Sequence, residues 1–134
     1  MAEEVVVKED LSQAMMRAGA QLTELLIGAG MVVSASLWLY DAEANAWRLL
    51  IASPEVRKRG PKEVYGQIRA AIAQMPQGQP GLELMDVSAV DERYATVSLL
   101  RHAVKTGENL AAIRFAGNAI RGHLIEDAYI YRML

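Results

Sequence analysis

The stretch AAIRFAGNAIRGHLIEDAYIYRM, residues 111–133, decides the fold that we expect for this chain. Its side chains alternate between two kinds with a period of two, which is the repeat of a β-strand. Arg121-Gly122 is the best two-residue turn within it, although the asparagine-glycine preference of such turns is only half met. The stretch therefore predicts a β-hairpin whose register sets Arg114 opposite Tyr129.

The two faces of this predicted hairpin differ in chemistry. One face is apolar and holds Ile113, Phe115, Ala119, Leu124, Ala128 and Ile130. The other face mixes polar and aromatic residues and holds Arg114, Asn118, His123, Ile125, Asp127, Tyr129 and Tyr131. Arg114 and Asp127 lie diagonally across that face, so we expect them to form a structural ion pair.

A second hairpin is predicted upstream, where MVVSASLWLY (31–40) and AWRLLIAS (46–53) are β-prone runs joined by DAEAN (41–45). If Tyr40 lies opposite Trp47, one face carries Ser34, Ser36, Trp38, Tyr40, Trp47, Leu49 and Ile51. The other face is mostly small and aliphatic, which suits packing under helices, and carries Val33, Ala35, Leu37, Leu39, Arg48, Leu50 and Ala52.

Apolar residues at spacings of three and four predict helices in the remaining segments. The first helix is expected to begin at a capping box formed by Asp10 and Gln13 and to be ended by Gly28 and Gly30. The second is expected to begin at Pro61, after a loop at residues 53–61, and to stop before the next proline.

A turn-rich connector at residues 76–81 and a short strand at residues 82–88 are expected to follow. The third helix is then expected to begin at Asp91 or Ser88 and to end before Gly107. Its inward residues are expected to be Tyr94, Val97, Leu100 and Val104.

These elements predict one α+β domain over residues 1–134, in the order α-β-β-α-β-α-β-β. We expect a single mixed or antiparallel sheet of about five strands, with three helices on its aliphatic face. The opposite face would then expose five large aromatics, namely Trp38, Tyr40, Trp47, Tyr129 and Tyr131. Such a patch is too large for an ordinary monomer surface. Its cover is either a helix or the N-terminal segment of the same chain, a partner subunit, or a ligand.

Bulk properties exclude several classes of protein. The chain has no cysteine, so disulfides and thiolate catalysis are excluded, and its net charge of −2 makes nucleic acid an improbable partner. The N-terminus MAEEVVVKED is acidic, unlike a signal peptide, and no stretch approaches the ~20 apolar residues of a membrane span. We therefore expect a cytoplasmic protein without a membrane partner or a cofactor.

Local motifs for catalysis are weak. His102 and His123 lack the spacing of a metal pair, and the neighbours Glu126 and Asp127 point to opposite faces of a strand, so no metal site is expected. The run RKRGPK places Arg57, Lys58, Arg59 and Lys62 ahead of a helix N-terminus. These four are anion-site candidates, and the alternative is an ordinary solvated loop.

Four stretches resemble a family of short bacterial proteins of unknown function. They are ASLWLY, WRLLIASPEVRKRGPKEVYGQI, IRFAGNAI and IEDAYIYR, and the resemblance covers about Met31–Leu134. It implies one compact cytoplasmic domain and carries over no activity, cofactor or catalytic residue.

Two functional hypotheses follow from the sequence. The first is a non-enzymatic binding or protein-interaction module that uses the aromatic sheet face, with a homodimer formed through that face or through the sheet edge. The second is a small enzyme for an anionic small molecule, with Arg114, His123, Asp127 and Tyr129 in its site. The ligand or interface candidates are thus Trp38, Tyr40, Trp47, Arg114, His123, Asp127, Tyr129 and Tyr131.

Overall fold

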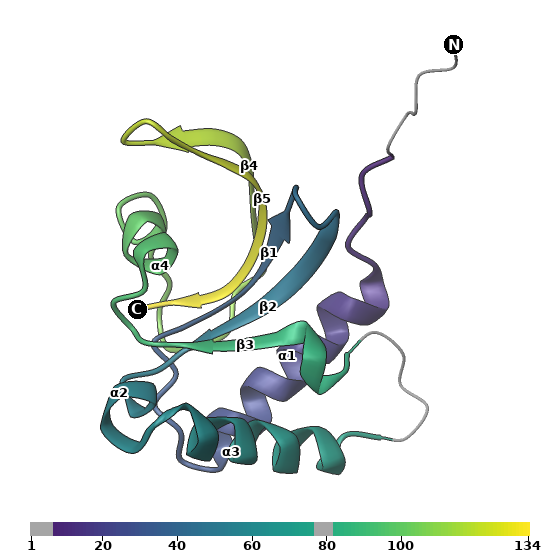
Figure 1. Cartoon of the computed structure of the whole chain (residues 1–134), viewed down its shortest axis with the longest axis vertical. Coiled ribbons are helices and arrows are strands. Elements are labelled where there is room, and N and C mark those ends of the chain that lie inside the picture. The colour runs from purple at the N-terminus through teal and green to yellow at the C-terminus, as the bar shows by residue number, and fades with distance from the viewer. Residues whose placement is uncertain (1–6, 77–81) are drawn as a thin grey trace.

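The computed structural model describes residues 7–76 and 82–134, and within them the chain forms one mixed sheet with helices on both sides (Figure 1). The α+β class and the five-stranded sheet confirm the expectation from the sequence. The elements in chain order are α1 (Gln13–Gly28), β1 (Ala35–Asp41), β2 (Ala46–Ala52), α2 (Glu55–Arg59), α3 (Pro61–Gln74), a 3-10 turn η1 (Leu84–Asp86), β3 (Val87–Val90), α4 (Ala95–Leu100), β4 (Ile113–Ile120) and β5 (His123–Met133).

The sheet has the strand order β3-β2-β1-β5-β4, so the last strand of the sequence lies beside the first. β3 runs parallel to β2, and all other neighbours are antiparallel. Both hairpins have the predicted register, with Tyr40 opposite Trp47 in one and Arg114 opposite Tyr129 in the other.

Helix boundaries differ from the prediction at several points. The N-cap of α1 is Ser12 rather than Asp10, because the Ser12 hydroxyl accepts a hydrogen bond from the Met15 N–H at 3.1 Å. α3 begins at Pro61 as expected. The expected loop at residues 53–61 is wrong, since its middle forms the short helix α2.

The elements after α3 are also shorter than predicted. The strand expected at residues 82–88 begins only at Val87, because η1 occupies the preceding residues. The third predicted helix is reduced to the six residues of α4, and Tyr94 is 45% exposed instead of inward. Most of the predicted connector, residues 77–81, lies outside the described residues.

Helices cover both faces of the sheet, which corrects the expectation that all of them pack on the aliphatic face (Figure 1). α1 and α3 cover the aromatic face and form an aromatic core with it. The buried members of this core include Leu22, Leu26, Trp38, Trp47, Val64, Ile68 and Tyr131. α4 packs on the other face and forms an aliphatic core whose members include Leu37, Leu50, Val97, Leu100, Ala128 and Ile130.

The aromatic face is therefore interior, and a homodimer through it is ruled out as long as the fold stays intact. Trp38, Tyr131 and Trp47 are only 0%, 2% and 5% exposed. The polar atoms of two of these rings find partners on α1. The Trp38 indole N–H donates to the Met15 carbonyl at 3.2 Å and to the Tyr131 hydroxyl at 3.1 Å, and that hydroxyl donates to a carbonyl of α1. Burial also raises the pKa of Tyr131 far above its ordinary value.

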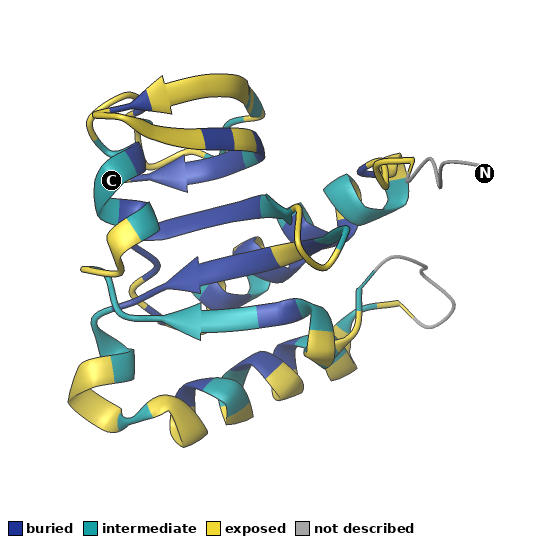
Figure 2. Ribbon diagram, turned by 45° about the horizontal axis from the view of Figure 1, so that its top comes forward, coloured by how far each residue is buried: buried dark blue, intermediate teal, exposed yellow. Residues whose placement is uncertain are grey.

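The tip of the β4–β5 hairpin departs from the predicted alternation. Ile120 and Ile125 are buried against the aliphatic core, whereas Leu124, expected on the apolar face, is 63% exposed. The backbone of β4 leaves the extended conformation at Gly117, whose φ is +64°. The hairpin curls towards α4, and Figure 2 shows its tip largely exposed above the buried central strands.

Candidate functional site

The predicted ion pair between Arg114 and Asp127 is present. The guanidinium donates from Nε to Oδ1 at 2.5 Å and from Nη2 to Oδ2 at 2.6 Å, and Lys8 Nζ donates to Oδ2 at 2.5 Å. Burial opposes the charged form of Asp127, which is 3% exposed, but the hydrogen bonds from Arg114 and Lys8 outweigh it and hold the pKa of this carboxyl below its usual range. Asp127 is thus a saturated carboxylate, which makes it a poor general base.

The residues around this ion pair hold the start of the described chain against the β1–β2 turn. The Trp47 indole N–H donates to the Glu9 carbonyl at 2.8 Å. Asn45 accepts from the Glu9 N–H at 2.8 Å, accepts from the Tyr40 hydroxyl at 2.6 Å, and donates to the Val7 carbonyl at 3.0 Å. These contacts give Tyr40 and Trp47 a structural role.

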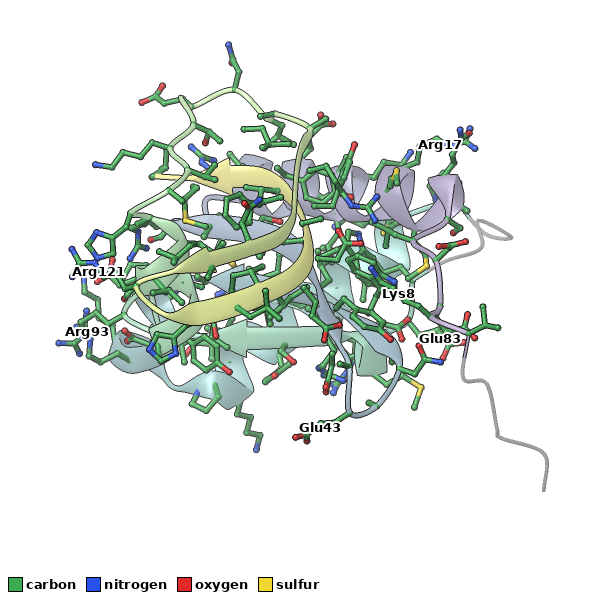
Figure 3. The ribbon with its side chains drawn as sticks, turned by 90° about the horizontal axis from the view of Figure 1, so that it is seen from above. Lys8, Arg17, Glu43, Glu83, Arg93 and Arg121 are labelled. Atoms are coloured by element: carbon green, nitrogen blue, oxygen red, sulfur yellow. The ribbon has the colours of Figure 1, made fainter. Side chains whose placement is uncertain are left out.

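Lys8 completes the same anchor from the N-terminal segment. Its ammonium lies 4.7 Å from the centre of the Tyr40 ring and 5.5 Å from that of Trp47, in addition to its bond to Asp127. In Figure 3 Lys8 points into the molecule, whereas Arg17, Glu43 and Arg121 point away from it. Lys8 was not a candidate from the sequence, and no local motif marks it.

The four residues of the enzyme hypothesis do not converge. Arg114, Asp127 and Tyr129 lie together at one end of the hairpin. His123 is exposed beside the turn at the other end and pairs with Ile120. Tyr129 follows His123 by six positions on β5, which corresponds to roughly 20 Å along an extended strand.

The predicted anion-site cations do not form a free cluster. Arg57 is paired with Asp91 at 3.3 Å and with Glu92 at 2.9 Å. Arg59 lies 3.5 Å from carboxylate oxygens of both Glu55 and Glu63. Over the described ranges, only Lys58 and Lys62 of the four have no ion-pair partner. Nearby carboxylates thus compensate much of the positive charge.

Two kinds of feature are absent from residues 7–76 and 82–134. Within these ranges no three histidine or acidic side chains gather where they could hold a metal ion. None of the helices there has the length and apolar character needed to span a membrane.

A groove of about 690 Å³ lies on the α4 side of the sheet. We call it the hairpin groove, because the tip of the β4–β5 hairpin forms one wall. The sheet forms its floor, and the beginning of α4 with the preceding loop forms the opposite wall. The residues that line the groove include Leu39, Asp41, Arg48, Leu50, Ser88, Val90, Tyr94, Leu124, Ile125 and Glu126.

The floor of the hairpin groove carries both aliphatic and polar side chains, because residues at alternate positions of β1, β2 and β3 face it. Leu39 pairs with Arg48, and Leu50 pairs with Ser88, so these four side chains share one face of the sheet. The Arg48 guanidinium lies across this floor and donates from Nε to the Ser88 hydroxyl at 2.9 Å.

The walls contribute the exposed residues. Leu124 and Tyr94 are large side chains at the rim, on the hairpin and before α4 respectively, and both are substantially exposed. Glu126 adds a carboxylate on the hairpin wall, and Asp41 adds another at the β1–β2 turn. The site thus combines aliphatic side chains with a few charged groups, as small-molecule sites commonly do.

Sequence reasoning missed this site, although one signal was present. Arg48 is the single charged residue within an otherwise small and aliphatic set on the first hairpin, and a charge in such a set indicates a place where the sheet is not covered. Leu124 carried no comparable signal, because its exposure depends on the changed alternation beyond Gly117.

Comparisons with protein-family models, with curated proteins and with solved structures gave no match to this chain. The resemblance to a family of short bacterial proteins therefore stays a prediction.

Proposed function

We propose that this protein is a non-enzymatic binding module that holds an amphipathic ligand in the hairpin groove. The observation that carries the proposal is the groove itself, about 690 Å³ in volume, with Leu39 and Leu50 beside Arg48 and Ser88 on its floor. Sites for small ligands have volumes of roughly 300–1,000 Å³ and combine apolar walls with a few polar groups. The binding surface is thus on the sheet face opposite to the aromatic one.

The exposed rim residues support this assignment. Leu124 and Tyr94 stand on two separate walls, and neither belongs to the aromatic or the aliphatic core. Each would lose water-accessible apolar surface when a ligand fills the groove, and such burial contributes about 25 cal/mol per Å².

The polar groups of the hairpin groove and of the ion pair give weaker support to an enzymatic function than to binding. In the hairpin groove Ser88 accepts a hydrogen bond from the cationic Arg48, which does not activate a hydroxyl as a nucleophile. At the ion pair, both oxygens of Asp127 already accept hydrogen bonds from cations. The enzyme hypothesis with Arg114, His123, Asp127 and Tyr129 would need His123 to move the length of the hairpin.

The proposal is tested by titrating the protein with 8-anilinonaphthalene-1-sulfonate, a fluorescent amphiphile. We expect binding that perturbs the amide resonances of Leu39, Arg48, Ser88 and Val90, and that weakens when Leu124→Ser and Tyr94→Ser are combined. The matched control combines Val32→Ser and Met85→Ser, which change exposed apolar residues outside the groove. Perturbations centred on α1 and α3, or equal weakening in both double variants, would refute the proposal.

The homodimer remains part of the proposed function, now through the sheet edge alone. Among the strands of the described residues β4 lies at the edge of the sheet beside β5, and an unpaired edge can accept a strand from a second copy. Sedimentation as a monomer at high micromolar concentration would end this idea. We also retain the cytoplasmic location as a proposal, since it rests on the sequence alone.

A further inference from the structure

We infer that the hairpin groove takes a short peptide with a free ammonium group at one end and a free carboxylate at the other. This inference rests on the proposed function and adds the chemical class of the ligand. It starts from the two opposite charges that the groove presents, on Arg48 and Glu126.

Arg48 is suited to hold a carboxylate. Its bond from Nε to Ser88 fixes the plane of the guanidinium on the groove floor, and across the described ranges its two terminal nitrogens have no hydrogen-bond or ion-pair partner. A guanidinium held in this way presents parallel N–H groups that match the two oxygens of a carboxylate.

Glu126 is suited to hold an ammonium group. It is exposed on the hairpin wall and forms no ion pair with another part of the described chain. The other acid of the groove, Asp41, already accepts hydrogen bonds from the Glu43 and Ala44 N–H groups of its own turn. Both of these bonds end on Oδ1 of Asp41, whereas over the described ranges neither carboxylate oxygen of Glu126 accepts a hydrogen bond from the protein.

The spacing of the two charges selects a ligand of a few residues. Leu39 pairs with Arg48 on one side and with Ala128 on the other, so two strand spacings, roughly 10 Å, separate Arg48 from Ala128. Glu126 precedes Ala128 by two residues on β5, which adds roughly 7 Å along that strand. The backbone positions are thus on the order of 12 Å apart, and both side chains shorten the gap.

An extended peptide spans about 3.3–3.6 Å per residue, so two to four residues separate its terminal charges by a matching distance. The ammonium and carboxylate of a single amino acid are closer together than the termini of a short peptide and are a poorer match to the spacing of Glu126 and Arg48, and a fatty acid has no ammonium group. An apolar side chain of the peptide would rest on Leu39, whose strand lies between those of Arg48 and Glu126.

The test compares trileucine with its N-acetylated form and its C-terminal amide, by isothermal titration at neutral pH and low salt. We expect trileucine to bind at least about tenfold more tightly than either capped peptide. Each cap removes one charge and the hydrogen-bonded contact that this charge would make, and the loss of such a contact weakens binding by about that factor. Arg48→Gln should remove the preference for a free carboxylate only, and Glu126→Gln the preference for a free ammonium only.

Arg121→Gln and Glu43→Gln are the matched controls, because both side chains point away from the molecule in Figure 3 and neither lines the groove. They should leave all affinities unchanged. Equal affinities for the three peptides would overturn the inference, and the proposed function would stand if the fluorescent amphiphile still mapped to the groove. Absence of binding by the peptides and the amphiphile alike would overturn both.

Discussion

Replacing Gly19 by alanine should destabilise the protein, although the same change in a helix normally stabilises it. Gly19 lies in α1 where the helix crosses the two buried rings of the aromatic core. A Cβ at this position would stand 2.5 Å from the Tyr131 hydroxyl oxygen, 2.6 Å from the Trp38 indole nitrogen and 2.9 Å from Tyr131 Cε2. All three separations are below van der Waals contact, so the rings or the helix must move.

The expected change in the free energy of unfolding is the balance of one stabilising and two destabilising effects. Alanine gains about 1 kcal/mol over glycine in a helix interior. Overpacking of a tight core costs about 1–3 kcal/mol, and each buried hydrogen bond broken when Trp38 and Tyr131 move costs about 1–3 kcal/mol more. We therefore expect Gly19→Ala to lower the free energy of unfolding by about 3 kcal/mol in urea denaturation followed by circular dichroism.

Gly66→Ala is the matched control, since Gly66 lies within α3 and a Cβ there meets no atom within 4 Å. This variant should be more stable than the wild type by roughly 0.5–1 kcal/mol. The two substitutions thus have opposite predicted signs. If Gly19→Ala were as stable as Gly66→Ala, the close packing of α1 on Trp38 and Tyr131 would be wrong.

Three further predictions concern the core, the ion pair and the basic loop. Trp38→Asp combined with Tyr131→Asp should abolish the folded circular dichroism signal, because both side chains are core, whereas a folded monomer would show that they are surface. Because the pKa of Asp127 is lowered in the folded protein, its stabilisation is present above about pH 4 and is lost as the pH falls through the folded pKa. Asp127→Asn should therefore be less stable at pH 7 and should lose less stability on acidification, and parallel pH profiles would contradict this. Arg57→Ala should cost less than about 1 kcal/mol in urea denaturation, since its ion pairs are partly exposed, and a larger loss would mean that α2 depends on them.

Both hairpin registers could be predicted from the sequence because a turn and a period of two fix them together. The side on which the helices pack could not, because both sheet faces are apolar enough to be buried. The aromatic face was expected to need a cover because five large aromatics form too large an apolar patch for a monomer surface, and the sequence left open whether the same chain, a partner or a ligand supplies that cover. Trp38 and Tyr131 instead find acceptors among the carbonyls of α1, which side-chain periodicity does not reveal.

The candidate site was less predictable than the fold. The pairing of Arg114 with Asp127 followed from register alone, and the structure confirms it. The expected approach of His123 failed because residues on one face of a strand can still lie far apart along it. The hairpin groove depends on the curl of β4 and β5, which begins where Gly117 takes a positive φ.

The position of β5 beside β1 has a consequence for how the chain reaches its folded state. Ala35 pairs with Met133, so the centre of the sheet joins residues from near the two ends of the described chain. During synthesis on the ribosome, β1 and β2 emerge long before β5 and wait with one side of β1 unpaired. Contacts so distant in sequence form slowly. Until they form, Trp38 lacks Tyr131, and the nascent chain presents an open strand edge to chaperones or to a second nascent copy.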